Sequence, residues 1–394
     1  MKNRKLVCLQ IHNDYLIPGG ETKTAIQIAN LLERFGINVI RYYKSNSELK
    51  KCGTIKKLAY GFKSLYNKST VDEINKILGS ITVDFVLIHN TMPIISNSVY
   101  GIFIKKNIPI IKYVQNYNLV CLNGALDHGS SCENCKKHLL NGVINKCYKN
   151  SFLYSFVRYI SKKIFDKYYF PYINAFMPNS MFVKRKHMEY GMDGEKMYVM
   201  NNYINIKHVN QLKKKSQNYY LYFGRISKEK GIITVLRAFE YLKDLKLVVM
   251  GSGEFETELK KYILDHNLKN IIYIGNKTGK DLEQVIANAK CTIVSSEWDE
   301  PLPRTIIESY SKGIPVIGTN KGGIPEMIHE NKTGYIYQSG CYNELINTII
   351  KFEEIPSTQY AQMCENCIQQ IENIYTEEKY FSRFMKCIED ILSP

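Results

Sequence analysis

The sequence predicts an α/β protein built from two doubly wound, parallel-sheet domains. Short apolar segments alternate with amphipathic segments of helical length, which is typical of parallel sheets covered by helices. The length of 394 residues exceeds one ordinary domain and suits two domains of roughly 180 residues each. We therefore expect an N-terminal domain over residues 1–200 and a second domain over residues 201–376.

The individual elements follow from hydrophobic periodicity. Strands are expected at residues 6–11, 38–42, 85–89, 108–114 and 175–178, and helices at residues 23–35, 71–78 and 155–168. Residues 201–216 are polar and rich in lysine, which indicates a linker, and the alternation resumes at Tyr219. Residues 377–392 form a final amphipathic segment.

Composition narrows the class of protein. The apolar content is sufficient for two cores, and no apolar run approaches the roughly 20 residues that a membrane span needs. The charged lead before the first strand is too short for a signal peptide, so we expect a cytoplasmic protein.

The most informative segment carries two carboxylates eight positions apart, Glu300 and Glu308. A proline-rich turn follows the first and the apolar run 305–307 precedes the second, so Glu300 is predicted in a loop and Glu308 in the helix after it. Carboxylates accept strong hydrogen bonds from sugar hydroxyls, and a helix N-terminus favours phosphate. Taken alone, the pair is also consistent with two surface glutamates beside a helix start.

Three glycine-containing segments accompany this pair. An apolar strand ends at Gly224 and is followed by Arg225 and Lys230, two cations that can clamp a diphosphate. A second strand ends in glycines at residues 251–253, and a third precedes the glycine-rich loop at residues 321–323. Each segment alone is ordinary turn chemistry, but four such motifs in this order, on alternating strands and helices, are a strong signal.

With these motifs the chain resembles the retaining glycosyltransferases of glycosyltransferase family 4 (glycosyl transferases group 1), of the type that builds bacterial surface polysaccharides. The spacing of Glu300 and Glu308 matches the family's E-x7-E motif, and the resemblance is most specific from Phe223 to Glu326. It implies the GT-B fold, in which two Rossmann-like domains face a cleft, with the segment 377–394 packing back on the N-terminal domain.

The same resemblance implies a hexosyltransferase that moves a sugar, with retention, from a UDP- or GDP-sugar to a saccharide or a polyprenyl-diphosphate-linked acceptor. Such an enzyme would serve O-antigen, capsule or exopolysaccharide biosynthesis. No metal cofactor is expected for catalysis, because arginine and lysine stabilise the departing diphosphate. The implied catalytic residues are Arg225, Lys230, Glu300 and His89. The implied donor-binding residues are Gly19, Gly20, Gly224, Arg225, Lys230, Gly251, Glu300, Leu302, Pro303 and Glu308.

Acceptor-side residues are expected beyond the strands of the first domain. His89 follows a buried strand, at the sheet edge where open α/β sheets bind ligands, although a loop histidine is as often structural. Gln115 and Asn116 follow the next strand, and Gln115 stands where the family usually has histidine. Glutamine can bind a sugar hydroxyl but cannot act as a general base, so the family's histidine chemistry does not carry over at this position.

Charge is concentrated in the first half. Residues 1–200 hold 29 Lys and Arg against 13 Asp and Glu, whereas the rest of the chain is neutral. In a GT-B enzyme the first half binds the acceptor, so this excess favours a lipid-linked diphosphate and peripheral association with the cytoplasmic face of the inner membrane. A lysine-rich solvated surface is the other interpretation, and residues 154–168 fit either a membrane-surface helix or an ordinary domain helix. Nucleic acid is not expected, because no nucleic-acid motif accompanies the charge.

The chain has 11 cysteines, of which four cluster in one loop region of the first domain. Cys132 and Cys135 form a C-x2-C pair flanked by Cys121 and Cys147. Four thiolates at this spacing favour a structural zinc site, and the alternative is four free thiols or an occasional disulfide.

Two other functions remain open beside glycosyl transfer. A nucleotide-sugar 2-epimerase can share the GT-B fold but needs no sugar acceptor. A non-catalytic glycan- or lipid-binding partner would lack a working donor site, which the presence of Arg225, Lys230, Glu300 and Glu308 opposes. A dinucleotide oxidoreductase is disfavoured, because Gly251-Ser252-Gly253 lacks the third glycine of its fingerprint.

Overall fold

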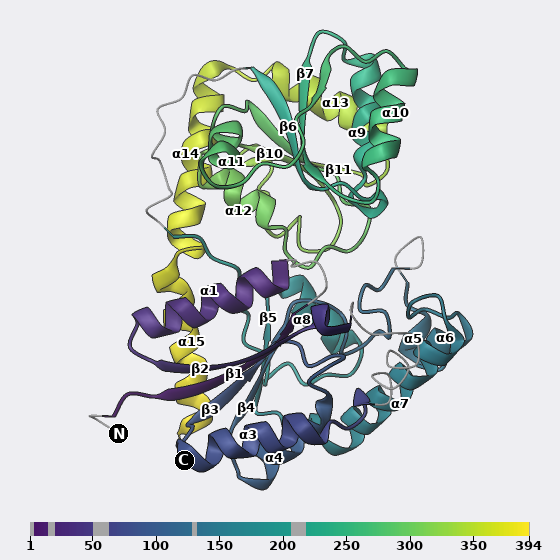
Figure 1. The fold of residues 1–394 in the computed structure, drawn as a ribbon. Coiled ribbons are helices and arrows are strands. Elements are labelled where there is room, and N and C mark those ends of the chain that lie inside the picture. The colour runs from purple at the N-terminus through teal and green to yellow at the C-terminus, as the bar shows by residue number, and fades with distance from the viewer. Residues whose placement is uncertain (1–3, 15–19, 50–62, 128–131, 206–217, 394) are drawn as a thin grey trace. The chain divides into compact units, whose positions relative to one another are not determined.

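The computed structural model describes residues 4–14, 20–49, 63–127, 132–205 and 218–393 (Figure 1). The chain divides into two compact units. Unit 1 comprises Met1–Asn179, Val183–Met200 and Phe381–Pro394, and unit 2 comprises Ser180–Phe182 and Asn201–Tyr380. Each unit has its own parallel β-sheet and its own helices, which confirms the predicted fold class.

The sheet of unit 1 has five parallel strands in the order β2-β1-β3-β4-β5. These strands are β1 (Val7–Asp14), β2 (Asn38–Ser45), β3 (Phe85–Ile88), β4 (Ile110–Val114) and β5 (Ala175–Pro178). All residues of β3 and β5 are buried, as expected for parallel strands covered on both faces. The predicted strands are confirmed, except that β1 and β2 continue past their predicted ends, β1 through His12 to Asp14 and β2 through Tyr43 to Ser45.

The helices of unit 1 cover this sheet. They are α1 (Gly20–Arg34), α3 (Lys68–Ser80), α4 (Tyr100–Lys105), α5 (Asn134–Lys137), α6 (Asn141–Ile144), α7 (Phe152–Tyr168) and α8 (Met181–Glu189), with short 3-10 turns η1 (Asn46–Leu49), η2 (Asn97–Val99) and η3 (Phe170–Tyr172). Figure 1 shows α1 and the pair α3 and α4 on opposite faces of the sheet. Helix α7 begins where Ser151 caps it by accepting a hydrogen bond from the Tyr154 backbone N–H.

The sheet of unit 2 has six parallel strands in the order β11-β10-β9-β6-β7-β8. They are β6 (Tyr219–Arg225), β7 (Lys246–Ser252), β8 (Ile271–Tyr273), β9 (Cys291–Val294), β10 (Val316–Thr319) and β11 (Gly334–Tyr337). The helices are α9 (Ile232–Tyr241), α10 (Glu256–Asp265), α11 (Gly279–Ala287), α12 (Arg304–Tyr310), α13 (Tyr342–Glu353) and α14 (Ser357–Ile374), with the turn η5 (Lys228–Lys230).

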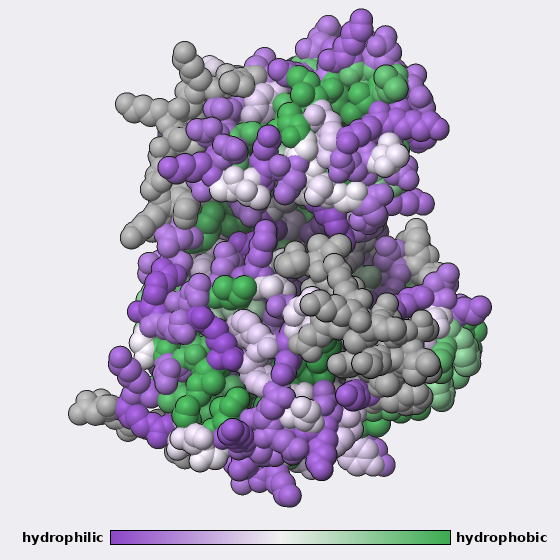
Figure 2. All heavy atoms as spheres, in the orientation of Figure 1, coloured by the Kyte–Doolittle hydropathy of each residue, from purple (hydrophilic) through white to green (hydrophobic). Residues whose placement is uncertain are grey.

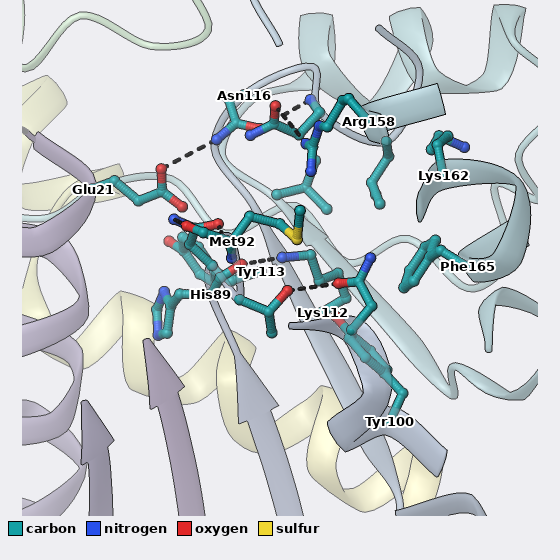
Figure 3. Close-up of a pocket in the computed structure, with 16 residues that line it drawn as sticks. Glu21, His89, Met92, Tyr100, Lys112, Tyr113, Asn116, Arg158, Lys162 and Phe165 are labelled. Carbon is teal, nitrogen blue, oxygen red and sulfur yellow. Dashed lines mark hydrogen bonds between the residues drawn. The ribbon is translucent and has the colours of Figure 1, made fainter. Parts of the chain in front are cut away.

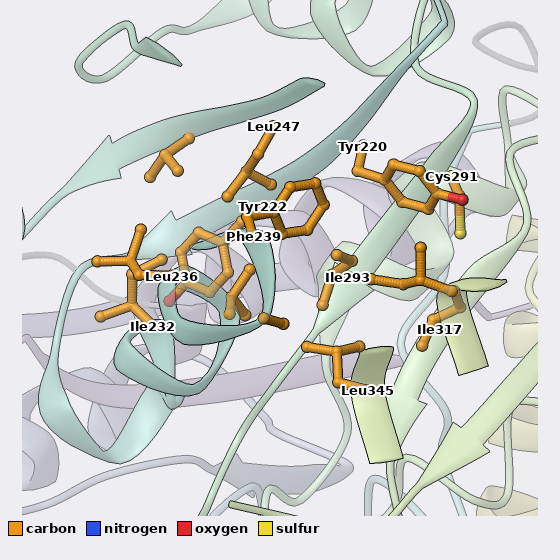
Figure 4. Close-up of a cluster of buried hydrophobic side chains, with 14 of the residues drawn as sticks. Tyr220, Tyr222, Ile232, Leu236, Phe239, Leu247, Cys291, Ile293, Ile317 and Leu345 are labelled. Carbon is orange, nitrogen blue, oxygen red and sulfur yellow. The ribbon is translucent and has the colours of Figure 1, made fainter. Parts of the chain in front are cut away.

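The core of unit 2 lies between its sheet and helices α9 and α13 (Figure 4). Tyr220 of β6 contacts Phe239 of α9 and Phe352 of α13, with ring centroids 5.7 and 6.2 Å apart. All three rings are almost completely buried. Because β6 lies at the centre of the sheet and is held on this core, the loops after its carboxyl end start from a fixed position.

The final helix, α15 (Glu377–Leu392), contributes Phe381–Leu392 to unit 1. There Phe381 stacks on Phe35 at 4.3 Å, and the buried Phe384 lies 6.0 Å from Phe85 of β3. Residues 206–217, most of the predicted linker, lie outside the described residues. Among the helices in the described ranges, none combines the length and the apolar character that crossing a bilayer requires.

Candidate functional site

In unit 2, two adjacent strands bring the predicted donor-site residues together. Strands β6 and β9 are neighbours in the sheet, so their carboxyl ends open at the same edge. The chain after β6 carries Lys230 in η5, and the chain after β9 carries Glu300. The Lys230 Nζ lies 2.5 Å from Glu300 Oε1 and 2.6 Å from Glu300 Oε2. Residues 70 positions apart in sequence thus form one ion pair at this edge.

The carboxylate of Glu300 is fixed on a further side. Ser296 Oγ donates a hydrogen bond of 2.5 Å to Glu300 Oε2, and Ser296 itself is buried. The side chains of Lys230 and Glu300 are 20% and 12% exposed, so the pair is accessible to a ligand but largely removed from bulk water. Charge-assisted hydrogen bonds in such a setting are strong and orient the groups that form them. The Lys230 side chain also lies over the Trp298 ring, with Nζ 5.7 Å from its centroid.

The backbone of Glu300 is held by the glycine-rich loop that follows β10. Gly323 donates its backbone N–H to the Glu300 carbonyl at 2.7 Å. Gly322 has φ +58°, and a Cβ there would lie 2.2 Å from the Glu300 carbonyl oxygen. Only glycine permits this close approach. The loop that appears in the sequence as a phosphate-type glycine motif therefore also supports the position of Glu300.

The other predicted donor residues lie near the carboxyl ends of β6 and β7, or in α12 and just before it. As predicted, Glu300 is in the loop before α12 and Glu308 is within that helix, where Arg304 Nε lies 4.0 Å from Glu308 Oε1. Arg225 ends β6 and is exposed, with its Nη2 2.6 Å from Glu229 Oε1. Gly224 precedes it, and Leu302 and Pro303 lie just before α12, where Leu302 is buried and Pro303 is the N-cap. Gly251 of β7 lies against Gly224, where a Cβ on Gly251 would be 1.8 Å from the Gly224 oxygen.

In unit 1, His89 is buried within a hydrogen-bonded network. The Gln10 amide nitrogen lies 2.8 Å from His89 Nε2 and also donates to the Ala25 carbonyl at 3.0 Å, while Tyr43 donates to Gln10 Oε1 at 2.5 Å. Because the amide nitrogen can only donate, His89 Nε2 accepts, and the ring proton is assigned to Nδ1. Burial holds the pKa of His89 well below its usual value, with His12 and Lys112 adding to the shift. His89 is therefore neutral and has no free basic nitrogen, and the catalytic role predicted for it stays a prediction.

The remaining acceptor-side residues lie at the same edge of the unit 1 sheet. Asn116 donates to Glu21 Oε2 at 3.1 Å, and Glu21 lies in the first turn of α1, one residue after Gly20. Gln115 follows β4, and within the described residues its buried amide nitrogen has no hydrogen-bond partner. Gly19 lies outside the described residues.

A pocket opens at this edge between β4, the segment after β3, and α7 (Figure 3). Its lining includes the predicted residues His89 and Asn116, together with Glu21, Lys112 and Arg158. Sequence reasoning did not identify Lys112 and Arg158 as site residues. Lys112 is a cation inside an otherwise apolar strand, 110–114, and this was the signal that could have found it.

The zinc prediction is not borne out by the structure. Among the described residues, which include Cys121, Cys132, Cys135 and Cys147, no group of three or more His, Cys, Asp or Glu side chains is placed to hold a metal ion. The Cys121 Sγ is directed instead to Asn123 Oδ1, 2.9 Å away. Burial raises the pKa of Cys135 to about 11, and the nearby thiols of the other three cysteines add to this shift, so Cys135 is a neutral thiol at pH 7.

Two parallel-sheet Rossmann-like units, one with a Lys–Glu pair and glycine-rich loops at its carboxyl edge, define the GT-B class of fold. Solved structures share the fold over the whole chain. A glycosyltransferase from Rickettsia africae covers 99% of this chain and 100% of its own, at 19% identity and a TM-score of 0.72. Anabaena Alr3699/HepE, solved with UDP and glucose, covers 98% of this chain and 100% of its own, at 16% identity and a TM-score of 0.67.

Residues 204–373, which lie in unit 2, match the family model of glycosyl transferases group 1. Curated relatives align over a similar length. Spore coat protein SA of Bacillus subtilis is 34% identical over 149 residues, which is 34% of this chain and 40% of the relative. Lipopolysaccharide 1,2-N-acetylglucosaminetransferase of Salmonella typhimurium is 29% identical over 178 residues, which is 42% of this chain and 46% of the relative. The alignments thus span less than half the length of these two relatives.

Proposed function

We propose that this protein is a retaining hexosyltransferase that moves a sugar from a nucleotide-sugar donor, a UDP- or GDP-sugar, to a saccharide or lipid-linked acceptor. The observation that carries the proposal is the Lys230–Glu300–Ser296 cluster beside Arg225, at the carboxyl edge of the unit 2 sheet. The match of residues 204–373 to glycosyl transferases group 1 supports it. Relatives named for lipopolysaccharide and colanic acid synthesis support a role in surface-polysaccharide assembly.

The chemistry follows from the charges at this edge. As the sugar leaves the donor, negative charge develops on the diphosphate, and Lys230 and Arg225 stabilise it. Both cations are held by carboxylates in the present structure, Lys230 by Glu300 and Arg225 by Glu229. Donor binding exchanges these contacts, at least in part, for contacts with the diphosphate. Glu300 then accepts hydrogen bonds from the sugar hydroxyls, and Glu308 accepts them from the ribose.

The proton of the acceptor hydroxyl needs a base. We propose that His89 is not this base, because its Nε2 already accepts a hydrogen bond from Gln10 and burial disfavours its protonated form. Gln115 cannot supply one at all. We therefore propose that an oxygen of the departing diphosphate takes the proton. Arg225 and Lys230 stabilise the negative charge of the diphosphate without a metal ion.

The test is turnover of UDP- and GDP-sugars in metal-free buffer by the full chain and three variants. Arg225→Ala and Lys230→Ala each lower turnover by about 100-fold or more, the usual loss for a group that stabilises transition-state charge. Lys228→Ala removes the same charge from an exposed position of the same turn, η5, and leaves turnover within about twofold. Equal effects of all three variants would refute the assigned roles.

Product analysis separates the alternatives. NMR of the product reports whether the anomeric configuration is retained. Conversion of the sugar to its C2 epimer without any acceptor would identify the 2-epimerase. Nucleotide binding that is absent in calorimetry, with UDP and GDP alike, would favour the non-catalytic partner.

We further propose that unit 1 associates with an anionic membrane surface. Its helices α6 and α7 carry exposed apolar side chains, of which Ile144 is 64% exposed and Phe152 is 58% exposed. Figure 2 shows hydrophobic residues gathered at the margin of the molecule where Figure 1 places these helices. The exposed Lys146 and Lys149 lie between the two helices in sequence, and this combination suits acidic lipid head groups.

Co-sedimentation with phosphatidylglycerol vesicles tests this surface. Ile144→Ser combined with Phe152→Ser weakens binding, whereas Leu264→Ser does not, although Leu264 is 79% exposed on unit 2. Phosphatidylcholine vesicles serve as the uncharged reference. Vesicle binding that is the same for the double variant and the unaltered chain, and the same for both lipids, would overturn the proposal.

A further inference from the structure

The pocket of unit 1 is unusual in its charge. Three cationic side chains line it, Lys112 from β4 and Arg158 and Lys162 from α7, against one carboxylate, Glu21 (Figure 3). Lys162 is paired within its own helix with Asp166. Lys112 and Arg158 form no ion pair with any side chain in the described parts of the chain. Two cations are thus left without a carboxylate partner at the wall of one cavity.

Neutral groups hold these two cations in place. The Lys112 Nζ donates to the backbone carbonyl of His89. Arg158 Nη2 donates to Asn118 Oδ1 at 3.1 Å, and its guanidinium lies over the Tyr148 ring with 5.9 Å to the centroid. A carbonyl, an amide and an aromatic ring orient a cation but leave its charge uncompensated. The arrangement is therefore positioned for a partner that the described residues do not provide.

The electrostatic cost of this arrangement is visible in Lys112. Burial lowers the pKa of Lys112 to about 8, the Glu21 carboxylate opposes this shift, and the Arg158 charge adds to it. Lys112 and Arg158 repel each other in a partly buried site, and a bound anion would remove that repulsion. Around the cations, Asn90, Asn97 and Asn116 line the same cavity and offer neutral donors and acceptors of the kind that bind sugar hydroxyls.

We infer that this pocket binds the anionic group of the acceptor, a phosphate or a carboxylate on a sugar, through Arg158 and Lys112. This inference rests on the proposed glycosyl transfer in one respect only, that the ligand is an acceptor. The planar guanidinium binds phosphate and carboxylate alike through two parallel hydrogen bonds, and the ammonium of Lys112 adds a point charge. The asparagines then receive the sugar that carries the charge.

Calorimetric titration of the full chain with three sugars tests the inference and separates the two anions. Glucose 1-phosphate, glucuronate and glucose are compared at constant ionic strength. One or both charged sugars bind and glucose does not, and the charged sugar that binds more tightly identifies the anion. Arg158→Gln and Lys112→Met each weaken that binding about tenfold or more, as expected for loss of a charged hydrogen bond. Lys163→Met removes a charge from an exposed position on the same helix and leaves affinity unchanged.

Two further arms keep this result distinct from the donor site. The titration is repeated in Lys230→Ala, where the charged sugar still binds in unit 1 and nucleotide binding in unit 2 is lost. UDP is titrated into Arg158→Gln, which retains the affinity of the unaltered chain. Equal binding of glucose, equal responses of Arg158→Gln and Lys163→Met, or loss in Lys230→Ala each overturn the anion pocket. Anion binding without any nucleotide binding would instead overturn the proposed transfer and leave the pocket standing.

Discussion

Gly322 offers a direct test of how the position of Glu300 is maintained. Its φ is +58°, and a Cβ placed on it would lie 2.2 Å from the Glu300 carbonyl oxygen and 2.4 Å from the Glu300 nitrogen. Both neighbours are backbone atoms, which cannot rotate away as the end of a flexible side chain can. Gly322→Ala must therefore move the loop, the backbone of Glu300, or both.

The expected loss of stability has two parts. An L-residue in the left-handed region costs about 1–2 kcal/mol, and relief of the steric overlap by a backbone shift costs about 1–3 kcal/mol more. Gly340→Ala isolates the first part, because Gly340 has φ +75° and nothing within 4 Å of the added Cβ. For a domain of this size about 1 kcal/mol lowers the melting temperature by about 2–4 °C. Gly322→Ala should then lower it by about 4–20 °C and Gly340→Ala by about 2–8 °C.

Scanning calorimetry of the full chain measures both variants, and nucleotide-sugar turnover is measured on the same samples. Turnover falls in Gly322→Ala because the carboxylate of Glu300 moves with its backbone, and it stays unchanged in Gly340→Ala. Equal melting temperatures and equal turnover in the two variants would refute the argument that this close backbone contact supports Glu300.

Three other predictions follow from unit 1. Burial lowers the pKa of His12 and of His187 to about 4, so between pH 6.5 and 4 the unfolded chain binds protons that the folded chain does not, and stability falls as the pH falls through this window. In denaturant titrations at stepped pH, the free energy of unfolding of His187→Gln falls less steeply with decreasing pH than that of the unaltered chain. An unchanged dependence on pH would contradict this. Burial lowers the pKa of Lys112 to about 8, so between pH 8 and 10.5 the unfolded chain holds a proton on Lys112 that the folded chain has lost, and the free energy of unfolding rises with pH. This rise is absent in Lys112→Met. Parallel curves of unfolding free energy against pH for the two proteins would rule out this contribution. Phe384→Ala lowers the free energy of unfolding by about 3–5 kcal/mol in chemical denaturation, since Phe384 is completely buried. Phe381→Ala lowers it by less, because Phe381 is half-buried. The reverse order would be inconsistent with the packing of α15.

Hydrophobic periodicity was sufficient to predict the fold class and most strands of unit 1, because buried parallel strands appear as continuous apolar runs. It failed at the end of β1, where the strand continues through His12, Asn13 and Asp14. These residues are polar, but Asn13 is hydrogen-bonded inside the protein, since its Oδ1 accepts from the Ile94 backbone N–H at 2.9 Å. A polar residue in a strand looks like a strand end until its partner, 81 positions away, is known.

The candidate site shows a similar division. The types of residue in the donor motif were predictable, and the positions of Glu300 and Glu308 relative to α12 were also predictable from the proline-rich turn. The contact between Lys230 and Glu300 depends on β6 lying beside β9, and strand order is not written in local sequence patterns. The zinc prediction failed because the spacing of the cysteines in the sequence does not determine where the Cys121 Sγ points. Lys112 and Arg158 converge only once β4 and α7 are folded.

Trp298 is the only tryptophan in the chain, and it lies in the loop that carries Glu300, under the ammonium group of Lys230. Within the described residues its buried indole N–H has no hydrogen-bond partner. The whole indole fluorescence of the protein therefore comes from one ring at the candidate donor site. A ligand that draws Lys230 away from the ring changes the electric field on the indole and so its emission, without any label. Trp298 is thus an intrinsic fluorescent probe of the site where nucleotide sugars are expected to bind, and a fluorescence titration can measure the occupancy of that site directly.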